Sequence, residues 1–186
     1  MSTTTERTTV LRTTSDDIRF RELVARLDQD LALRNGDSNA FFAQFNGVDR
    51  IHHVVVVLRE GEPVGCGAFK AFDPDTVELK RMYTAPEHRQ TGIGSMVVNE
   101  LVQWAGELGY TRCVLETGTK MTEAIALYGK RGFSRIPNYG PYVGVEDSVC
   151  FEKRRAWIGD VGAFREQLDE FSPSTVEPWS DSAGTS

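Results

Sequence analysis

The sequence predicts a mixed α/β fold, with a mostly antiparallel central sheet flanked by helices. Three strand-like runs follow one another with only short turns between them, which is the pattern of an antiparallel meander. Helical segments precede this meander, and further helices alternate with strands after it. The chain of 186 residues suits a single domain, and its 40% hydrophobic residues suffice for a core.

In the first half of the chain, apolar residues recur at helical spacing over residues 18–33. We expect this helix to be capped by Thr14 or Ser15 and to end near Asn35. A short second helix is expected over residues 40–45. The strands expected in this half cover residues 8–13, 51–58, 64–71 and 77–84.

In the second half, a helix is predicted from Gly92 to Gly109, because its apolar residues recur at roughly four-residue steps. The other elements expected here are a strand over 112–116, a helix over 121–130 and strands over 133–136 and 148–151. Residues 1–154 are assigned to one domain. Residues 155–171 are expected to form a C-terminal helical extension, either a homodimer contact or packing on the sheet, and 172–186 a disordered tail.

The turn before the helix that begins at Gly92 has the features of a pyrophosphate-binding cradle. Helix N-termini expose unpaired N–H groups and carry the positive end of the helix dipole, so they attract phosphate. Gly92 and Gly94 lack side chains that would keep an anion away from those N–H groups. Arg89 could add a planar, bidentate phosphate contact at the mouth of the turn.

Two other phosphate-binding motifs fit this turn less well. A P-loop needs a lysine directly after its last glycine, and no lysine follows Gly92 or Gly94. A dinucleotide-binding fingerprint needs a third small residue where Val97 stands, and a shorter turn than residues 85–91. Glu116, at the end of a later strand, does imitate the ribose-binding acid of that fingerprint.

The pattern Arg89-x-x-Gly92-x-Gly94 after a strand resembles the acetyl-CoA signature of the GNAT acyltransferases. The segment 124–133 is similar to that family's A-x-x-L-Y-x-x-x-G-F helix, and 115–118 to the strand between the two motifs. The resemblance covers roughly residues 10–153. It implies a GNAT-like acyl-CoA N-acyltransferase fold with splayed central strands. It also implies transfer of an acetyl group from acetyl-CoA to an amine, by direct attack in a ternary complex and without a metal.

The same resemblance implies a set of cofactor-binding residues. The backbone of Met82, Tyr83 and Thr84 would pair with the pantetheine arm of acetyl-CoA, as an added strand would. The pyrophosphate would be held by the turn and the first helical turn after it, namely Arg89, Gln90, Thr91, Gly92, Ile93, Gly94 and Ser95.

Three residues are candidates for catalysis. An amine with a pKa near 10.4 is almost wholly protonated at pH 7, so a carboxylate base is expected near it. Glu78 occupies the position where some family members carry such a glutamate, and Glu116 lies at the end of the next strand. Tyr128 matches the phenol that protonates the departing thiolate in many members. Strand alternation would put Glu78 on one face with Lys80 and Met82, opposite Val77, Leu79 and Arg81.

The acceptor is expected to be the primary amine of a small molecule or amino acid. The first two helices and the loop between the last two strands would supply its pocket, with Phe41, Phe42, Phe45, Asn138, Tyr139 and Tyr142. Each of these residues, and each candidate acid, also has an ordinary structural interpretation. Two other functions stay open: an acyl-CoA sensor without catalysis, and a protein or peptide N-acetyltransferase.

Composition limits the partners. The net charge of −6 argues against a nucleic-acid or anionic-membrane binder, whereas a local basic group around the turn suits coenzyme A. The three cysteines and three histidines show no metal-site spacing, and the cysteines lie in apolar runs as core thiols do. Because no apolar leader or membrane-length run is visible, a cytoplasmic location is expected.

Overall fold

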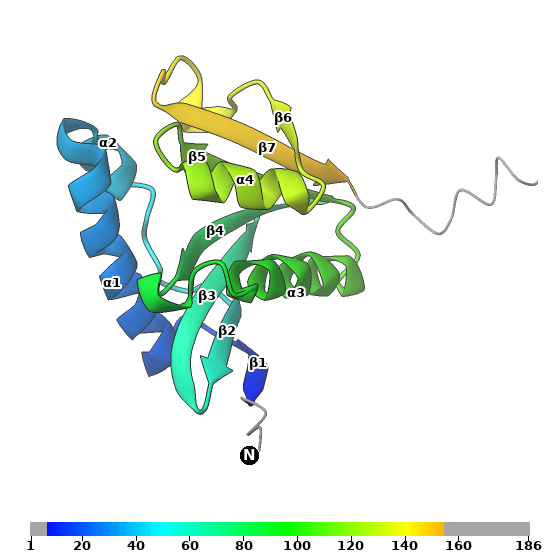
Figure 1. The fold of residues 1–186 in the computed structure, drawn as a ribbon. Helices are drawn as coiled ribbons and strands as arrows, with labels where there is room; N and C mark the ends of the chain where they lie inside the picture. The colour runs from blue at the N-terminus through cyan, green and yellow to red at the C-terminus, as the bar shows by residue number, and fades with distance from the viewer. Residues whose placement is uncertain (1–6, 155–186) are drawn as a thin grey trace, which may run out of the picture. The chain divides into compact units, whose positions relative to one another are not determined.

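A computed structural model of the chain describes residues 7–154, and the expectations for residues 155–171 and 172–186 lie outside that part. The described residues form one seven-stranded sheet in the order β1-β2-β3-β4-β5-β7-β6 (Figure 1). All neighbouring strands are antiparallel except β4 and β5, which are parallel. The predicted mixed, mostly antiparallel sheet is therefore confirmed. The strands are β1 (Thr8–Thr13), β2 (His53–Arg59), β3 (Glu62–Ala71), β4 (Thr76–Thr84), β5 (Arg112–Gly118), β6 (Ser134–Ile136) and β7 (Ser148–Arg154).

The helices are α1 (Ile18–Asn35), α2 (Asn39–Ala43), α3 (Ile93–Glu107) and α4 (Thr122–Lys130), with 3₁₀ turns η1 (Gly36–Ser38), η2 (Pro86–His88) and η3 (Gly140–Tyr142). The run Val54–Val57 shows how they pack, because all four valines are fully buried although their side chains alternate. Val54 and Val56 join a core with α1, and Val55 and Val57 join a core with α3 and α4. The sheet is thus covered on both faces (Figure 1).

The expected N-cap of the first helix is wrong. Asp17 caps α1, and its carboxylate accepts a hydrogen bond from the backbone N–H of Arg19 at 2.9 Å. Ser15 is instead buried beside Ile51: its N–H donates to the Ile51 carbonyl at 2.8 Å, and its hydroxyl accepts from the Ile51 N–H at 3.1 Å. The contact with Ile51 therefore occupies the Ser15 hydroxyl, which the local sequence pattern assigned to the N-cap of the helix.

The sheet opens between its two parallel strands. β4 and β5 pair only from Thr76–Arg112 to Leu79–Leu115. Beyond that point β4 stays paired with β3 as far as Thr84, and β5 stays paired with β7 as far as Gly118. The ends of β4 and β5 therefore diverge, which leaves one edge of β4 open for an added extended group.

A bulge in β4 corrects the expected alternation. Arg81 has a φ of 58°, and the β3–β4 register shifts opposite it, between Cys66 and Ala68. Glu78 and Lys80 keep the face that looks toward α1, and Arg81 joins them through an ion pair with Asp28 of α1. Met82 is carried to the opposite face, where it packs with the α3 core.

Two glycines of β3 set how closely α3 approaches the sheet. A Cβ on Gly65 would lie 2.4 Å from Cγ2 of Ile93, and one on Gly67 would lie 2.7 Å from Cγ1 of Val97. Because no side chain projects from β3 at these positions, the first turn of α3 rests directly on the strands. This close packing places the N-terminus of α3 beside the open end of β4.

Candidate functional site

A cavity of about 950 Å³ lies where β4 and β5 separate. Its walls come from α1, the second half of β4, the turn before α3, the end of β5 and α4. A volume of this size can hold an elongated, drug-sized ligand. Within residues 7–154, no helix is long and apolar enough to cross a membrane, and no cluster of three metal-ligating side chains was found.

The glycine turn forms one end of this cavity. Gly92 is the N-cap of α3 with a φ of 89°, a conformation that glycine adopts without strain, and no side chain caps the helix. The first bond of the helix runs from the Met96 N–H to the Gly92 carbonyl at 3.0 Å, so the N–H groups before it have no helical partner. Gly92, Gly94 and Ser95 line the cavity. The turn therefore presents backbone donors to a ligand.

The predicted cofactor-binding residues fall into two groups, those that line the cavity and those that do not. Eight of them line it: Met82, Tyr83, Thr84, Arg89, Gln90, Gly92, Gly94 and Ser95. Thr91 and Ile93 are not in that lining. Ile93 is fully buried in the core with α3, and the Thr91 hydroxyl donates to the His88 carbonyl at 2.6 Å. The side chains of these two residues shape the turn and do not line the cavity.

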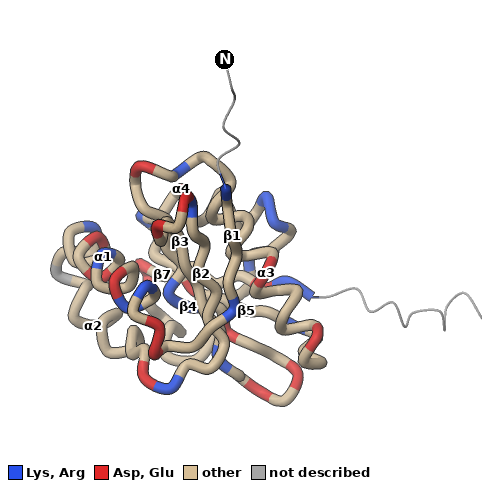
Figure 2. Tube along the Cα trace, turned by 90° about the horizontal axis from the view of Figure 1, so that it is seen from below, with Lys and Arg blue, Asp and Glu red and all other residues tan. Residues whose placement is uncertain are grey.

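Arg89 is tied to the protein on two sides. Its Nε donates to the Thr84 carbonyl at 3.2 Å, and its Nη2 lies 3.1 Å from Oδ2 of Asp30 on α1. Asp30 also pairs with Arg34 at 3.2 Å, and Arg34 pairs with Glu123 of α4. These four side chains form an ion-paired chain along the cavity wall, and α1 carries charges of both signs (Figure 2). A phosphate that bound Arg89 would compete with Asp30.

Glu116 lies at the other end of the cavity. It follows the short paired segment of β5, and its carboxylate accepts a hydrogen bond from the Ser148 hydroxyl at 2.6 Å. Burial raises the pKa of Glu116 to about 7, against the lowering effects of the Ser148 hydrogen bond and the Lys80 charge. The negative charge of Glu78 is the smaller of the two effects that raise the pKa to this value. Glu116 is therefore a carboxylate that can take up and release a proton near neutral pH.

Tyr128 also lines the cavity, from α4. It is 4% exposed, and burial together with the Glu116 charge raises the pKa of its phenol. The phenol therefore stays protonated over the neutral range and is available as a hydrogen-bond or proton donor.

Glu78 lies on the same face of the sheet as Glu116 but is not in the cavity lining. Its carboxylate accepts hydrogen bonds from Lys80 Nζ at 2.9 Å and from the Tyr139 hydroxyl at 3.0 Å. Both of its oxygens therefore have partners within the protein. Of the three predicted catalytic residues, Glu116 and Tyr128 line the cavity, whereas Glu78 is paired with Lys80 and does not line it.

The expected acceptor residues fall into two groups. Phe42 and Tyr142 line the cavity, and Phe41 and Phe45 pack against them edge-on. Asn138 has a structural role, because its Nδ2 donates to the carbonyls of Tyr142, Val145 and Ser148, each at 3.1 Å.

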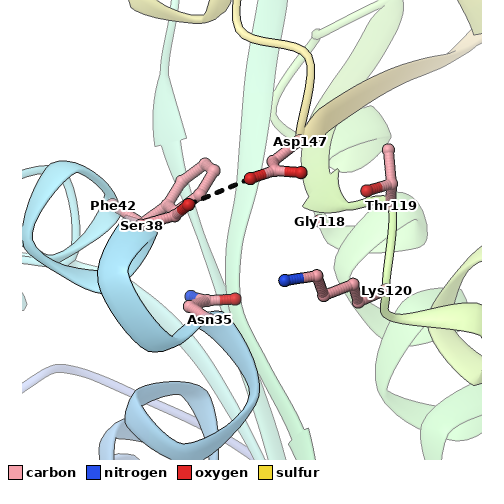
Figure 3. Close-up of a pocket in the computed structure, with 7 residues that line it drawn as sticks. All are labelled: Asn35, Ser38, Phe42, Gly118, Thr119, Lys120 and Asp147. Atoms are coloured by element: carbon pink, nitrogen blue, oxygen red, sulfur yellow. Dashed lines mark hydrogen bonds between the residues drawn. The ribbon is translucent and has the colours of Figure 1, made fainter.

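A small recess lies next to this end of the cavity and shares Asn35, Phe42 and Gly118 with its lining. Its volume is about 10 Å³, the size of one water, so it is a packing gap. Figure 3 shows the Ser38 hydroxyl donating to Asp147, at 2.9 Å, and the side chains of Asn35 and Lys120 pointing toward each other below this bond. The turn between α1 and α2 is thereby held to the loop before β7.

Residues 18–133 match the profile described as the Acetyltransferase (GNAT) family. The chain belongs to the GNAT family. An IAA acetyltransferase of Azospirillum brasilense is 38% identical over 101 residues, which are 53% of this chain and 65% of that protein. An uncharacterised N-acetyltransferase of Schizosaccharomyces pombe is 35% identical over 91 residues, 47% of this chain and 56% of its own length. The chain thus matches about half to two thirds of the length of these relatives.

Solved structures show the same GNAT architecture. A protein from Klebsiella pneumoniae, described as an acyl-CoA N-acyltransferase, has a TM-score of 0.65 and 28% identity, covering 79% of this chain and 97% of its own. An N-acetyltransferase from Thermoplasma acidophilum in complex with coenzyme A has a TM-score of 0.61 and 15% identity, covering 80% and 99%. The predicted GNAT-like fold is confirmed, and a neighbour of the same fold binds coenzyme A.

Sequence reasoning missed three residues that shape this GNAT site. Ser148, 3% exposed, holds Glu116 from a strand 32 positions away, and only the β5–β7 pairing reveals that contact. Asp30 pairs with Arg89 from the amphipathic first helix, where the sequence pattern gives no reason to distinguish this carboxylate from ordinary surface charge. Arg81 lines the cavity because of the bulge. For none of the three does the local sequence carry a signal of its role.

Proposed function

We propose that this protein is an N-acetyltransferase that transfers an acetyl group from acetyl-CoA to the primary amine of a small molecule or amino acid. One observation carries the proposal: a single cavity is lined at one end by Gly92 and Gly94 and at the other by Glu116 and Tyr128. A thioester bound at the glycine turn can therefore reach the carboxylate and the phenol without leaving the cavity.

Acetyl-CoA would lie along the open edge of β4. The N–H groups of the α3 N-terminus, including Gly94 and Ser95, would receive the pyrophosphate, with Gln90 at the turn. The pantetheine amides would pair with the backbone of Met82 to Thr84, which has no partner strand on the β5 side. The acetyl group would then reach the point where β4 and β5 separate.

In the proposed reaction, Glu116 accepts a proton from the ammonium form of the acceptor and releases it to solvent. The free amine attacks the thioester carbonyl, so that a C–N bond forms and the C–S bond breaks. Tyr128 gives its proton to the departing thiolate and regains one from the acylated nitrogen. The products are the N-acetyl compound and coenzyme A, and no metal takes part in the steps assigned here.

Glu78 is proposed as a supporting group. Its charge raises the pKa of Glu116, and it orients Lys80 and Tyr139 beside the site. We favour a small-molecule acceptor over a protein because the Ser38–Asp147 hydrogen bond joins the α1–α2 turn to the loop before β7 beside the acceptor end of the cavity. We infer a reducing, cytoplasmic location from the three buried, unpaired cysteines.

Titration calorimetry with acetyl-CoA, followed by a thiol-release assay with amines, amino acids and peptides, tests this function. Micromolar binding with release for one class of small amine is the expected result. Binding without release for any acceptor would favour an acyl-CoA sensor, and release for peptides alone would favour a protein acetyltransferase. Absence of binding would refute the assignment of the glycine turn.

A further inference from the structure

Arg81 is an unusual residue in the wall of the cavity. Its backbone has a φ of 58°, which is rare for residues other than glycine, asparagine and aspartate. Its side chain is 2% exposed although it carries a permanent charge. Strained backbone and buried charge tend to persist where they serve a function.

The guanidinium of Arg81 is only partly satisfied within the protein. Its Nη2 pairs with Asp28, whose side chain is 55% exposed on α1. Its Nε is buried and has no hydrogen-bond partner among the described residues 7–154. A buried donor without a partner is costly, and one next to a cavity can be satisfied by a ligand.

The charges around Arg81 suggest which ligand group that is. On the α1 face of the sheet, Arg81 and Lys80 line the cavity from β4, and Glu116 lines it from β5. Lys80 is already paired with Glu78 at 2.9 Å. The acceptor end of the cavity therefore offers one carboxylate and one incompletely paired guanidinium, on opposite sides of the opening between the strands.

We propose that the acceptor is an amine that also carries a carboxylate, and that Arg81 binds this carboxylate while Glu116 faces the ammonium group. The inference rests on the proposed acetyltransferase function and narrows its substrate class to amino acids and related zwitterions. A planar guanidinium suits a carboxylate because its donors match the two oxygens. Arg81 is thus a specificity-determining residue.

The test compares acceptors that differ only in the carboxylate. Thiol release is measured with amino acids and with their carboxamides, which keep the amine and the side chain. The wild-type protein is expected to prefer the acid by at least about tenfold in kcat/KM. This preference is informative because the amide has the less basic amine and would otherwise react faster at neutral pH.

Variants then assign the preference to Arg81. Arg81→Gln is expected to abolish the preference, because KM for the acid should rise about tenfold while KM for the amide changes less. Arg112→Gln is the matched control, because Arg112 is a sheet arginine whose Nε pairs with Glu152 at 2.7 Å outside the cavity. It should keep the full preference. Arg81→Lys, which keeps the charge without the planar fork, should be intermediate and covers the case in which Arg81→Gln does not fold.

Equal kcat/KM for acid and amide in the wild-type protein would overturn the inference and leave the acetyltransferase function standing. So would an undiminished preference in Arg81→Gln or Arg81→Lys. Acetyl-CoA binding without thiol release for any amine would instead reject the proposed function itself, and with it the role of Arg81.

Discussion

Replacing Glu116 with glutamine should remove the proposed base while keeping the shape of the side chain. The burial that raises the pKa of Glu116 to about 7 also improves it as a base. Moving a proton from an amine of pKa about 10.4 to this carboxylate costs about 4.6 kcal/mol, against about 8 kcal/mol for an ordinary glutamate. Because general bases contribute about 10²–10⁴ to rate, we expect kcat/KM at pH 7 to fall by a factor in that range.

The pH dependence should change in a definite direction. In the wild-type protein, ionised Glu116 must meet the ammonium form of the acceptor, so kcat/KM should rise up to about pH 7 and then stay level until the amine titrates. In Glu116→Gln, only amine already free in solution can react. The rate should therefore rise about tenfold per pH unit through the same range, and the gap between the two proteins should shrink toward pH 10.

The assay is thiol release at acceptor concentrations well below KM, from about pH 5.5 to pH 10, with an acceptor whose amine has an ordinary pKa. Calorimetry should give the same acetyl-CoA affinity for both proteins. Glu78→Gln is the matched comparison: the loss of the Glu78 charge lowers the pKa of Glu116, so the acid limb should move below pH 7 with little loss of maximal rate.

A Glu116→Gln variant that kept the wild-type rate and pH profile would show that Glu116 is not the base. If Glu78→Gln instead lost the acid limb of the pH profile and most of the maximal rate, Glu78 would be the base. It would then reach the amine through a movement of Lys80.

Three further outcomes are expected. Gly92 and Gly109 have φ of 89° and 93°, and both have open space around them. Gly92→Asp and Gly109→Asp should therefore each lower the free energy of unfolding by about 1 kcal/mol in denaturant titration. Only Gly92→Asp should weaken acetyl-CoA binding, by tenfold or more in calorimetry. Tyr128→Phe should lower kcat about tenfold without changing acetyl-CoA affinity, and an unchanged kcat would remove its role as proton donor. Ser148→Ala removes a hydrogen bond that lowers the pKa of Glu116, so the acid limb of the pH profile should move above pH 7. Ser148→Thr keeps the hydroxyl and should leave the limb in place. A limb that moved to lower pH in Ser148→Ala would contradict the hydrogen bond from Ser148 to Glu116.

The helices and strands could be predicted because they depend on neighbours along the chain. The predicted helix from Gly92 to Gly109 corresponds to α3, whose buried residues recur on one side against the sheet. The glycine turn was recognisable for the same reason, since a phosphate site at a helix N-terminus uses consecutive backbone groups. The predicted cap of α1 was wrong because Ser15 is hydrogen-bonded to Ile51, which is far away in sequence.

By itself, the sequence determined the order of the elements, the mixed sheet and the glycine turn, because periodicity and turn chemistry act over a few residues. The tertiary structure decided which side chains meet. The bulge at Arg81 reversed the alternation in β4 and brought a guanidinium to the cavity. The end of the β4–β5 pairing at Leu79 opened that cavity, and the β5–β7 pairing set Ser148 beside Glu116. Strand register, bulges and burial depend on pairing between distant segments, so these features follow only once the sheet has assembled.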